Sequence, residues 1–219
     1  MSDIVASAEL MDRIYRRQRH LYDFTRKFYL LGRDRLIHRL TPPAGSRVLE
    51  IGCGTARNLV VASRAYRDVH YFGIDISSEM LETARGVIER EGLAPYIRLA
   101  RADATTFDPA LQFGVPGFSR IFVSYSLSMM PGWQAVLDRA LGWVAPGGEL
   151  HVVDFGGQEG LPGWFRLGLR QWLRLFHVTP RDALEAELTL LGLRAGALTV
   201  FERPFRGYAQ YAICRRLAG

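Results

Sequence analysis

The chain has 219 residues, 48% of them apolar, which is enough to bury the core of one domain with additions. Two cysteines cannot build a disulfide framework, no apolar run reaches about 18 residues, and the N-terminus lacks the apolar core of a signal peptide, so we expect a soluble, intracellular protein. The net charge of +6 is carried largely by arginine, which reflects either a GC-rich genome or recognition of phosphate groups.

Residues 11–40 contain few helix breakers and predict a helix. After the break Thr41-Pro42-Pro43-Ala44-Gly45, short apolar runs alternate with helical segments. The predicted strands are residues 47–51, 71–74, 97–101, 120–124 and 149–155, and the predicted helices are residues 56–63, 78–91 and 134–144. This alternation predicts parallel strands that are covered by helices on both faces.

The last part of the chain predicts a helix over residues 179–191, followed by two β-like stretches at residues 198–203 and 208–215. Because only four residues, 204–207, separate these stretches, they can pair only as an antiparallel hairpin. The predicted fold class is therefore α/β, a doubly wound and mostly parallel sheet with an antiparallel C-terminal edge hairpin.

A glycine turn follows the first predicted strand, in the run VLEIGCGTARNLVV. Gly52 and Gly54 let a ligand approach the backbone closely, and the N-terminus of the next helix attracts negative charge. A turn of this kind binds either a dinucleotide or S-adenosylmethionine. Read as G-x-G-x-x-G, the run fails because Arg57 replaces the last glycine. Read as E-x-G-x-G-x-G, it fits with Glu50 and both glycines, and Ala56 stands in for the third.

The second pattern resembles the first motif of the class I S-adenosylmethionine-dependent methyltransferases, which have a Rossmann-like fold. The resemblance implies that Glu50 lies near the methionyl amino group, directly or through water. It also implies that residues 42–219 are the S-adenosylmethionine-binding methyltransferase domain and that residues 1–41 are a helical lid or extension over the cofactor. Asp75 ends the second predicted strand, 23 residues after Gly52, where a carboxylate can accept both ribose hydroxyls.

Three acids mark the ends of successive predicted strands: Glu50, Asp75 and Asp103. Each acid alone is explained equally well as a helix cap or a solvated loop residue, but the three together favour one shared ligand. Asp103 could accept from the adenine amino group, and its neighbour Ala104 offers a backbone N–H to the ring. No metal site is predicted. The rest of the predicted cofactor-binding set is Cys53, Asn58, Ile76, Met80 and Ser124, with Ile76 and Met80 beside the adenine.

The methyl acceptor is expected just beyond the fourth predicted strand, in the run FVSYSLSMMP. Enzymes that methylate amino groups of nucleic-acid bases typically carry an Asp/Asn-Pro-Pro-aromatic tetrad here. This chain instead has Ser124-Tyr125-Ser126-Leu127, so no nucleic-acid partner is expected. The Tyr125 ring could bind a product ammonium by cation–π attraction of about 0.5–2 kcal/mol. It could equally be a wall residue that packs against the cofactor.

The run LPGWFRLGLRQWLRLFHV predicts a basic amphipathic helix. Arg166, Arg170 and Arg174 recur every four residues and share one stripe of that helix. Trp164 and Trp172 carry rings of the type found at membrane interfaces. This pattern is typical of a helix that lies on anionic lipid. The alternative is an ordinary helix that docks its apolar face on the domain.

Five runs of the chain together resemble the bacterial diacylglycerylhomoserine N-methyltransferases of betaine-lipid synthesis, which are relatives of bacterial phosphatidylethanolamine N-methyltransferases. The runs are YDFTRKFYLLGRDRLI, LEIGCGTARNL, SYSLSMMP, LHVVDFG and LPGWFRLGLRQWLRLFHVTPR. The resemblance implies three successive methylations of a lipid headgroup amine, each converting S-adenosylmethionine to S-adenosylhomocysteine. It further implies contact with an anionic membrane surface and a cytoplasmic, peripheral location on the inner face of the membrane. The oligomeric state is not indicated.

The residues that would handle the acceptor are spread along the chain. Tyr22 and Arg26 lie four residues apart on one face of the first predicted helix, and either could reach the methionyl carboxylate or an anionic group of the acceptor. Core packing and solvation are the alternatives. His177 could act beside the headgroup, whereas His151 lies inside a predicted strand and is expected to be structural. Tyr22, Tyr125 and His177 are the predicted catalytic residues, and the two tyrosines are the better candidates for orienting the amine.

Other functions stay open on this evidence. Phosphatidylethanolamine would differ from the betaine-lipid precursor only in headgroup charge, and a quinone or another small apolar acceptor would also require an aromatic-lined pocket near a membrane. A non-catalytic S-adenosylmethionine-binding module and a nucleic-acid binder belong to other functional classes. A dinucleotide oxidoreductase is disfavoured by Arg57 and by the absence of an obvious second substrate domain.

Overall fold

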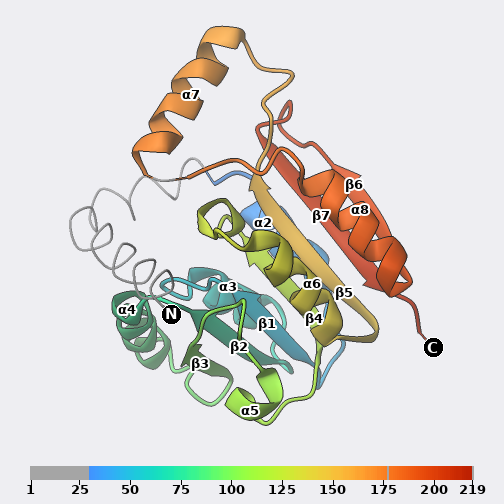
Figure 1. The fold of residues 1–219 in the computed structure, drawn as a ribbon. Coiled ribbons are helices and arrows are strands. Elements are labelled where there is room, and N and C mark those ends of the chain that lie inside the picture. Colours follow the sequence, from blue (N-terminus) through green and yellow to red (C-terminus); the bar gives the residue numbers. More distant parts are fainter. Residues whose placement is uncertain (1–29, 177, 219) are drawn as a thin grey trace.

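The computed structural model describes residues 30–176 and 178–218, which form one seven-stranded sheet (Figure 1). The strand order is β3-β2-β1-β4-β5-β7-β6. The strands are β1 (Arg47–Ile51), β2 (His70–Asp75), β3 (Ile97–Arg101), β4 (Phe118–Ser124), β5 (Val144–Phe155), β6 (Ala197–Glu202) and β7 (Ala209–Arg216). Strands β1 to β5 pair in parallel, whereas β7 is antiparallel to both β5 and β6. The expected doubly wound sheet with a C-terminal antiparallel hairpin is confirmed.

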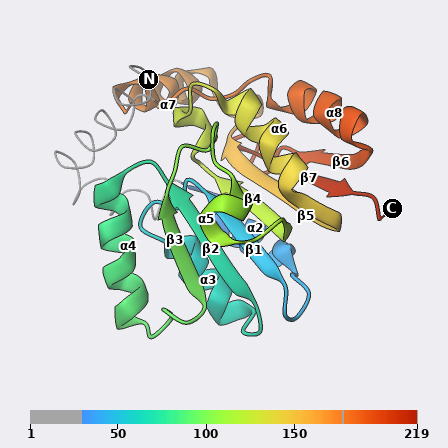
Figure 2. The same cartoon turned by 60° about the horizontal axis from the view of Figure 1, so that its bottom comes forward.

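Helices cover both faces of this sheet and bury two apolar clusters. One cluster lies under α5, α6 and α8, and the other under α2, α3, α4 and α7. Figure 2 shows α6 and α8 on the opposite side of the sheet from α2 and α3. The helices are α2 (Arg33–Leu40), α3 (Arg57–Ala65), α4 (Ser78–Arg90), α5 (Pro109–Phe113), α6 (Trp133–Trp143), α7 (Gly163–Leu175) and α8 (Leu184–Ala195), with a 3-10 turn η1 (Leu127–Met129).

The expected first helix differs from the observed one within the described residues. Leu30, Leu31 and Gly32 are not helical, and α2 begins at Arg33. The φ angle of Gly32 is 94°, a left-handed conformation that glycine adopts without steric cost and that a continuous helix excludes. The N-terminal helical lid expected over residues 1–41 lies mostly outside the described residues, and its one described helix, α2, packs into the core beneath the sheet.

Three further elements depart from the sequence-based expectation, and one of them is α8, which begins at Leu184 instead of residue 179. Strand β5 begins at Val144, five residues before the expected start, and its early residues join β4 across a register irregularity. Such irregularities depend on the neighbouring strand, so local composition does not reveal them. Helix α5 was not expected, although Asp108 is a strong N-cap signal: its side chain accepts hydrogen bonds from the backbone N–H groups of Ala110 and Leu111.

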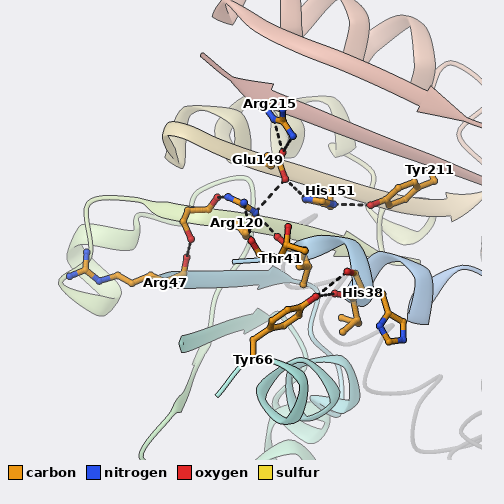
Figure 3. A network of polar contacts seen from close by, with 12 residues as sticks. His38, Thr41, Arg47, Tyr66, Arg120, Glu149, His151, Tyr211 and Arg215 are labelled. Carbon is orange, nitrogen blue, oxygen red and sulfur yellow. Dashed lines mark hydrogen bonds and ion pairs between the residues drawn. The ribbon is translucent and has the colours of Figure 1, made fainter. Parts of the chain in front are cut away.

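A buried polar network holds the centre of β5 to its neighbours (Figure 3). Glu149 is 4% exposed, and its carboxylate accepts a hydrogen bond of 2.7 Å from Arg215 and lies 3.3 Å from Arg120. His151 Nε2 lies 3.0 Å from the same carboxylate, and its Nδ1 lies 2.8 Å from the Tyr211 hydroxyl. Because Glu149 can only accept, Nε2 carries the proton and Nδ1 accepts from Tyr211. His151 is therefore a structural residue, as expected.

The same network attaches α2 to the sheet. Arg120 donates hydrogen bonds of 2.6 and 3.1 Å to the carbonyls of Leu40 and Thr41 at the C-terminus of that helix. Arg39, in the last turn of α2, lies with its guanidinium 5.0 Å from the centre of the Tyr211 ring. Helix α2 is thus fixed by charged groups of β4 and by an aromatic ring of β7.

The carboxylate of Glu149 should dominate the acid sensitivity of the fold. The hydrogen bond from His151, together with Arg215 and Arg120, lowers the pKa of Glu149 to about 2 from an ordinary value of 4.5. A lowered folded-state pKa contributes stability above pH 4.5, and that stability is lost as the pH falls toward 2. We predict that this contribution is about 3 kcal/mol.

Chemical unfolding of Glu149→Gln across this pH range checks the prediction. The variant should already be less stable at pH 7, and its unfolding free energy should change less between pH 5 and pH 2 than that of the wild type. Glu185→Gln is the matched control, because Glu185 forms only an exposed ion pair with Arg203. Equal acid slopes for the wild type and Glu149→Gln would contradict the prediction.

Candidate cofactor and acceptor site

The turn after β1, residues 52–56, is the centre of the site and is called the cofactor turn below. Gly52 has a φ angle of 71°, and a side chain there would place its Cβ 2.5 Å from the Cβ of Ser126. The backbone N–H groups of Gly52 and Cys53 both donate to the Ile74 carbonyl, at 2.8 and 3.0 Å. Only a glycine therefore lets the tip of β1 lie against both the end of β2 and the loop after β4.

Asp75, at the end of β2, fixes two backbone segments at once. One carboxylate oxygen accepts from the Gly54 N–H at 2.8 Å, and the other accepts from the Ser77 N–H at 3.0 Å. The Ser77 hydroxyl in turn accepts from the Met80 N–H and caps α4. The expectation that a carboxylate at the end of this strand accepts the two ribose hydroxyls stays a prediction.

Several of the predicted cofactor residues line one cavity of about 320 Å³. Glu50 is 1% exposed, and its carboxylate accepts a hydrogen bond of 2.7 Å from Asn58. Ser124, the last residue of β4, is also buried and completes this wall. The predicted residues in the lining are Glu50, Gly52, Cys53, Asn58 and Ser124, and the others are Leu30, Arg33, Thr55, Arg57, Thr83 and Val87.

Arg33 is a candidate site residue that the sequence analysis missed. It is 8% exposed, begins α2, and lines the same cavity as Glu50. A buried guanidinium suits a carboxylate, and a buried carboxylate suits an ammonium, so this cavity can hold the zwitterionic end of an amino acid. The sequence offered no signal, because Arg33 is one of many arginines near the N-terminus and only the fold brings it to the cavity.

The adenine side of the predicted site lies outside the lining of that cavity. Asp103, just after β3, accepts from the backbone N–H and the hydroxyl of Thr105, at 2.8 and 2.7 Å. Ala104 and Met80 are buried, and Ile76 is half-buried. Met80 packs against Phe176, the residue that follows α7. The residues predicted beside the adenine thus lie at the tips of β2 and β3 and in the first turn of α4, where Phe176 contacts Met80.

Tyr125 occupies a strained and buried position directly after β4. Its φ angle is 55°, its side chain is 2% exposed, and its hydroxyl donates to the Leu31 carbonyl. Its ring meets Phe155 edge-on, with 4.7 Å between the ring centres. Burial raises the pKa of Tyr125 well above its usual value, so the hydroxyl stays protonated. The predicted role of Tyr125 in orienting an amine stays a prediction, and Tyr22, Arg26 and His177 lie outside the described residues.

Comparisons with known proteins agree with this geometry. Residues 48–148 match the family model of a methyltransferase domain. An O-methyltransferase of Aspergillus nomiae is 29% identical over 71% of this chain and 68% of its own length. A phosphatidylethanolamine N-methyltransferase of Cereibacter sphaeroides is 34% identical, over 50% of this chain and 51% of its own length. The chain thus spans only about half the length of the second relative.

Solved structures show the same fold. A phosphoethanolamine N-methyltransferase of Haemonchus contortus in complex with S-adenosylmethionine superposes with a TM-score of 0.67 at 15% identity, over 85% of this chain and 52% of that one. This likeness shows the fold, and the matched family model shows that residues 48–148 carry a methyltransferase domain. The expected enzyme class and the expected cofactor, S-adenosylmethionine, are therefore confirmed, whereas the expected betaine-lipid subfamily stays a prediction.

Arg33 should hold the methionyl carboxylate of the cofactor. We predict that Arg33→Gln weakens binding of S-adenosylhomocysteine by about 10- to 100-fold, because a charge-assisted hydrogen bond contributes roughly 1.5–3 kcal/mol. Titration calorimetry should show no comparable loss for 5′-methylthioadenosine, which has no carboxylate. Arg64→Gln, at an exposed ion pair with Glu91, is the matched control. Equal losses of affinity for both ligands would contradict the prediction and would show that Arg33 supports the structure of the site instead of binding the carboxylate.

Proposed function

We propose that the protein transfers methyl groups from S-adenosylmethionine to the amine of a membrane-lipid headgroup, with three successive methylations of diacylglycerylhomoserine as the reaction. The sequence resemblance described above supports this acceptor, and so does the 34% identity to a phosphatidylethanolamine N-methyltransferase. The observation that carries the proposal is helix α7, which presents one apolar face to the methyltransferase domain and a second one to solvent.

The inner face of α7 packs on the domain. Leu173 is 1% exposed, and Phe165, Leu169, Trp172 and Phe176 pack against the cluster beneath α2, α3 and α4. Figure 1 shows the helix beyond the carboxyl end of β5, the end of the sheet where the cofactor turn lies. Helix α7 is therefore an ordinary docked helix on this side, which was one of the two interpretations of its sequence.

The outer face of α7 is apolar and exposed. Trp164, Leu167 and Leu175 are 76%, 71% and 70% exposed, and their spacing places them on one stripe of the helix. Arg166 and Arg174 lie on a neighbouring stripe, to one side of the apolar one, and are also exposed, whereas Arg170 forms an ion pair of 3.0 Å with Asp182. Exposed Trp and Leu beside arginines are typical of a helix that inserts shallowly into an anionic lipid surface. Both interpretations of this helix are thus compatible.

A peripheral attachment of this kind would deliver a lipid headgroup to the site while its acyl chains stay in the membrane. No helix in the described part of the chain is long and apolar enough to cross a bilayer. We place the protein on the cytoplasmic face of the membrane, where anionic lipids attract arginines. Guanidinium groups near the site would hold the carboxylate of the homoserine headgroup.

Methyl transfer from a sulfonium is an in-line displacement, so the protein mainly has to align donor and acceptor. When bound, S-adenosylmethionine supplies the electrophilic methyl group. The amine must be unprotonated to attack, and removal from water lowers the pKa of an amine. The buried surroundings of Ser124 and Tyr125, at the end of β4, would provide this desolvation. Phosphatidylethanolamine offers the same amine beside a phosphate, and the similarity to its methyltransferase makes it the second candidate.

A transfer assay tests the acceptor. The protein is given S-adenosylmethionine labelled in its methyl group, together with vesicles that contain diacylglycerylhomoserine, phosphatidylethanolamine or neither lipid. We predict label in mono-, di- and trimethylated diacylglycerylhomoserine. Label in phosphatidylethanolamine alone would establish the second candidate. Parallel reactions contain a quinone, a hydroxylated small molecule or RNA instead of the two lipids. Label in one of these acceptors, with both lipids unlabelled, would overturn the lipid proposal.

A vesicle-binding experiment tests the role of the outer face of α7. We predict that Arg166→Gln combined with Arg174→Gln weakens binding to vesicles with 30% anionic lipid by about tenfold or more, since each basic residue near such a surface contributes about 1 kcal/mol. Trp164→Ala should also weaken binding. Arg194→Gln is the matched control, at an exposed position near the end of α8. Unchanged co-sedimentation of the double variant would exclude α7 as the membrane-binding element.

A further inference from the structure

The loop that follows β4, residues 125–130, lies beside the cofactor turn. It is called the acceptor loop here because the methyl acceptor is expected next to it. The Ser126 hydroxyl donates to the Ile51 carbonyl at 3.0 Å, and the Ser126 side chain fills the space beside Gly52. Tyr125 has a left-handed backbone with a φ angle of 55°, which is unfavourable for a residue other than glycine. The loop therefore holds a strained shape against the cofactor turn, and something outside it must maintain that shape.

Arg181 holds the C-terminal side of the loop. It comes from the connection between α7 and α8, and its guanidinium donates to three carbonyls of the loop. The distances are 3.0 Å to Leu127, 3.4 Å to Ser128 and 2.8 Å to Met130. The Thr179 N–H adds a bond of 2.9 Å to the same Ser128 carbonyl. A planar cation with several donors is thus matched to three neighbouring backbone carbonyls of the loop.

Asp154 holds the opposite side of the same turn. It is fully buried near the end of β5, and its carboxylate accepts from the Ser128 N–H at 3.0 Å and from its neighbour Phe155 at 2.7 Å. Burial raises the pKa of Asp154 to about 6, and the positive charge of Arg181 opposes this rise. Asp154 and Arg181 thus bind the N–H and the C=O of the same peptide unit, between Leu127 and Ser128, from opposite sides.

The base of this arrangement is itself tied to the sheet. Gln210, in β7, donates from its side-chain amide to the Phe155 carbonyl at 2.8 Å and to the Arg181 carbonyl at 3.1 Å. The Arg181 guanidinium also lies 5.8 Å from the centre of the Trp133 ring, which begins α6. Contacts with the C-terminal hairpin and with α6 therefore hold the two charged residues in place. These residues in turn restrict the movement of the acceptor loop.

We propose that Arg181 and Asp154 are positioning residues for methyl transfer, which hold the backbone of η1 from two opposite sides and so fix the acceptor loop against the cofactor turn. Neither residue lines the cavity that holds the cofactor residues, so each acts through the loop. Burying an anion costs several kcal/mol before its partners offset that cost, and a purely apolar contact would stabilise the fold at least as well. We therefore assign the charged groups of Arg181 and Asp154 to maintaining the conformation of the acceptor loop. This inference depends on methyl transfer, and it holds for any acceptor.

The test compares Arg181→Gln and Asp154→Asn with the matched control Arg203→Gln. Arg203 likewise lies over an aromatic ring, 5.3 Å from the centre of Phe201, and pairs with acids, but it does not hold the acceptor loop. Hydrogen exchange of backbone amides in residues 125–131 is followed in the presence of S-adenosylhomocysteine, which requires no acceptor. We expect at least tenfold faster exchange there in both variants, and no change in the control.

Two further measurements separate positioning from general stability. The affinity for S-adenosylhomocysteine should stay within about threefold of wild type in both variants. The turnover number with the lipid that the wild type methylates should fall at least 30-fold, with a smaller change in KM, and Arg181→Lys should be intermediate. The double variant should lose no more turnover than the more damaged single variant, because both residues act on one element.

Three results would overturn the proposal. The first is unchanged exchange in residues 125–131, and the second is a turnover number equal to that of Arg203→Gln. The third is faster exchange throughout the chain in both variants, which would assign the pair to overall stability. Failure of the lipid proposal would leave the exchange and binding measurements valid, so the two proposals fail separately.

Discussion

The close contact between Gly52 and its two neighbours is the constraint on which the site depends. The end of β1 lies against the Ile74 carbonyl on one side and against Ser126 on the other, and no Cβ fits between them. This contact brings together the tips of β1, β2 and β4, where the strand order of the sheet reverses. The Asp75 carboxylate accepts a hydrogen bond from the Gly54 N–H of this turn, and Glu50 lines the cavity beside it. The cofactor site is thus a consequence of backbone packing at this one position.

Strand β5 carries two buried acids, and each carboxylate is stabilised by polar groups of neighbouring elements. Glu149, in its middle, is surrounded by Arg120, Arg215 and the neutral His151, and it fastens α2 to the sheet. Asp154, at its end, meets a backbone N–H of η1 and the charge of Arg181. In both cases a buried charge is matched to a helix end or to a cation, as burial in a low dielectric requires. The first acid keeps the fold together, and the second shapes the loop beside the site.

Helix α7 has one face that packs on the domain and another that is exposed to solvent. Its last residues contact the adenine side of the predicted site through Phe176 and Met80, and the connection after it supplies Thr179 and Arg181 to the acceptor loop. Its outer face exposes Trp164 and two leucines to solvent. A membrane that bound this outer face would therefore contact the same element that leads into the acceptor loop.

The sequence by itself determined the alternation of strands and helices, the C-terminal hairpin, and the cofactor turn with Glu50, Asp75 and Asp103 at successive strand ends. These features follow from local rules: side-chain periodicity, short connections, and the need for glycine at a left-handed turn. Only the tertiary structure decided that Arg33 lines the cavity and that Arg181 reaches a carbonyl 54 residues away in the chain. The physical reason is that an arginine side chain has the same local pattern wherever it points, and its role is set by which distant backbone the folded sheet places within its reach.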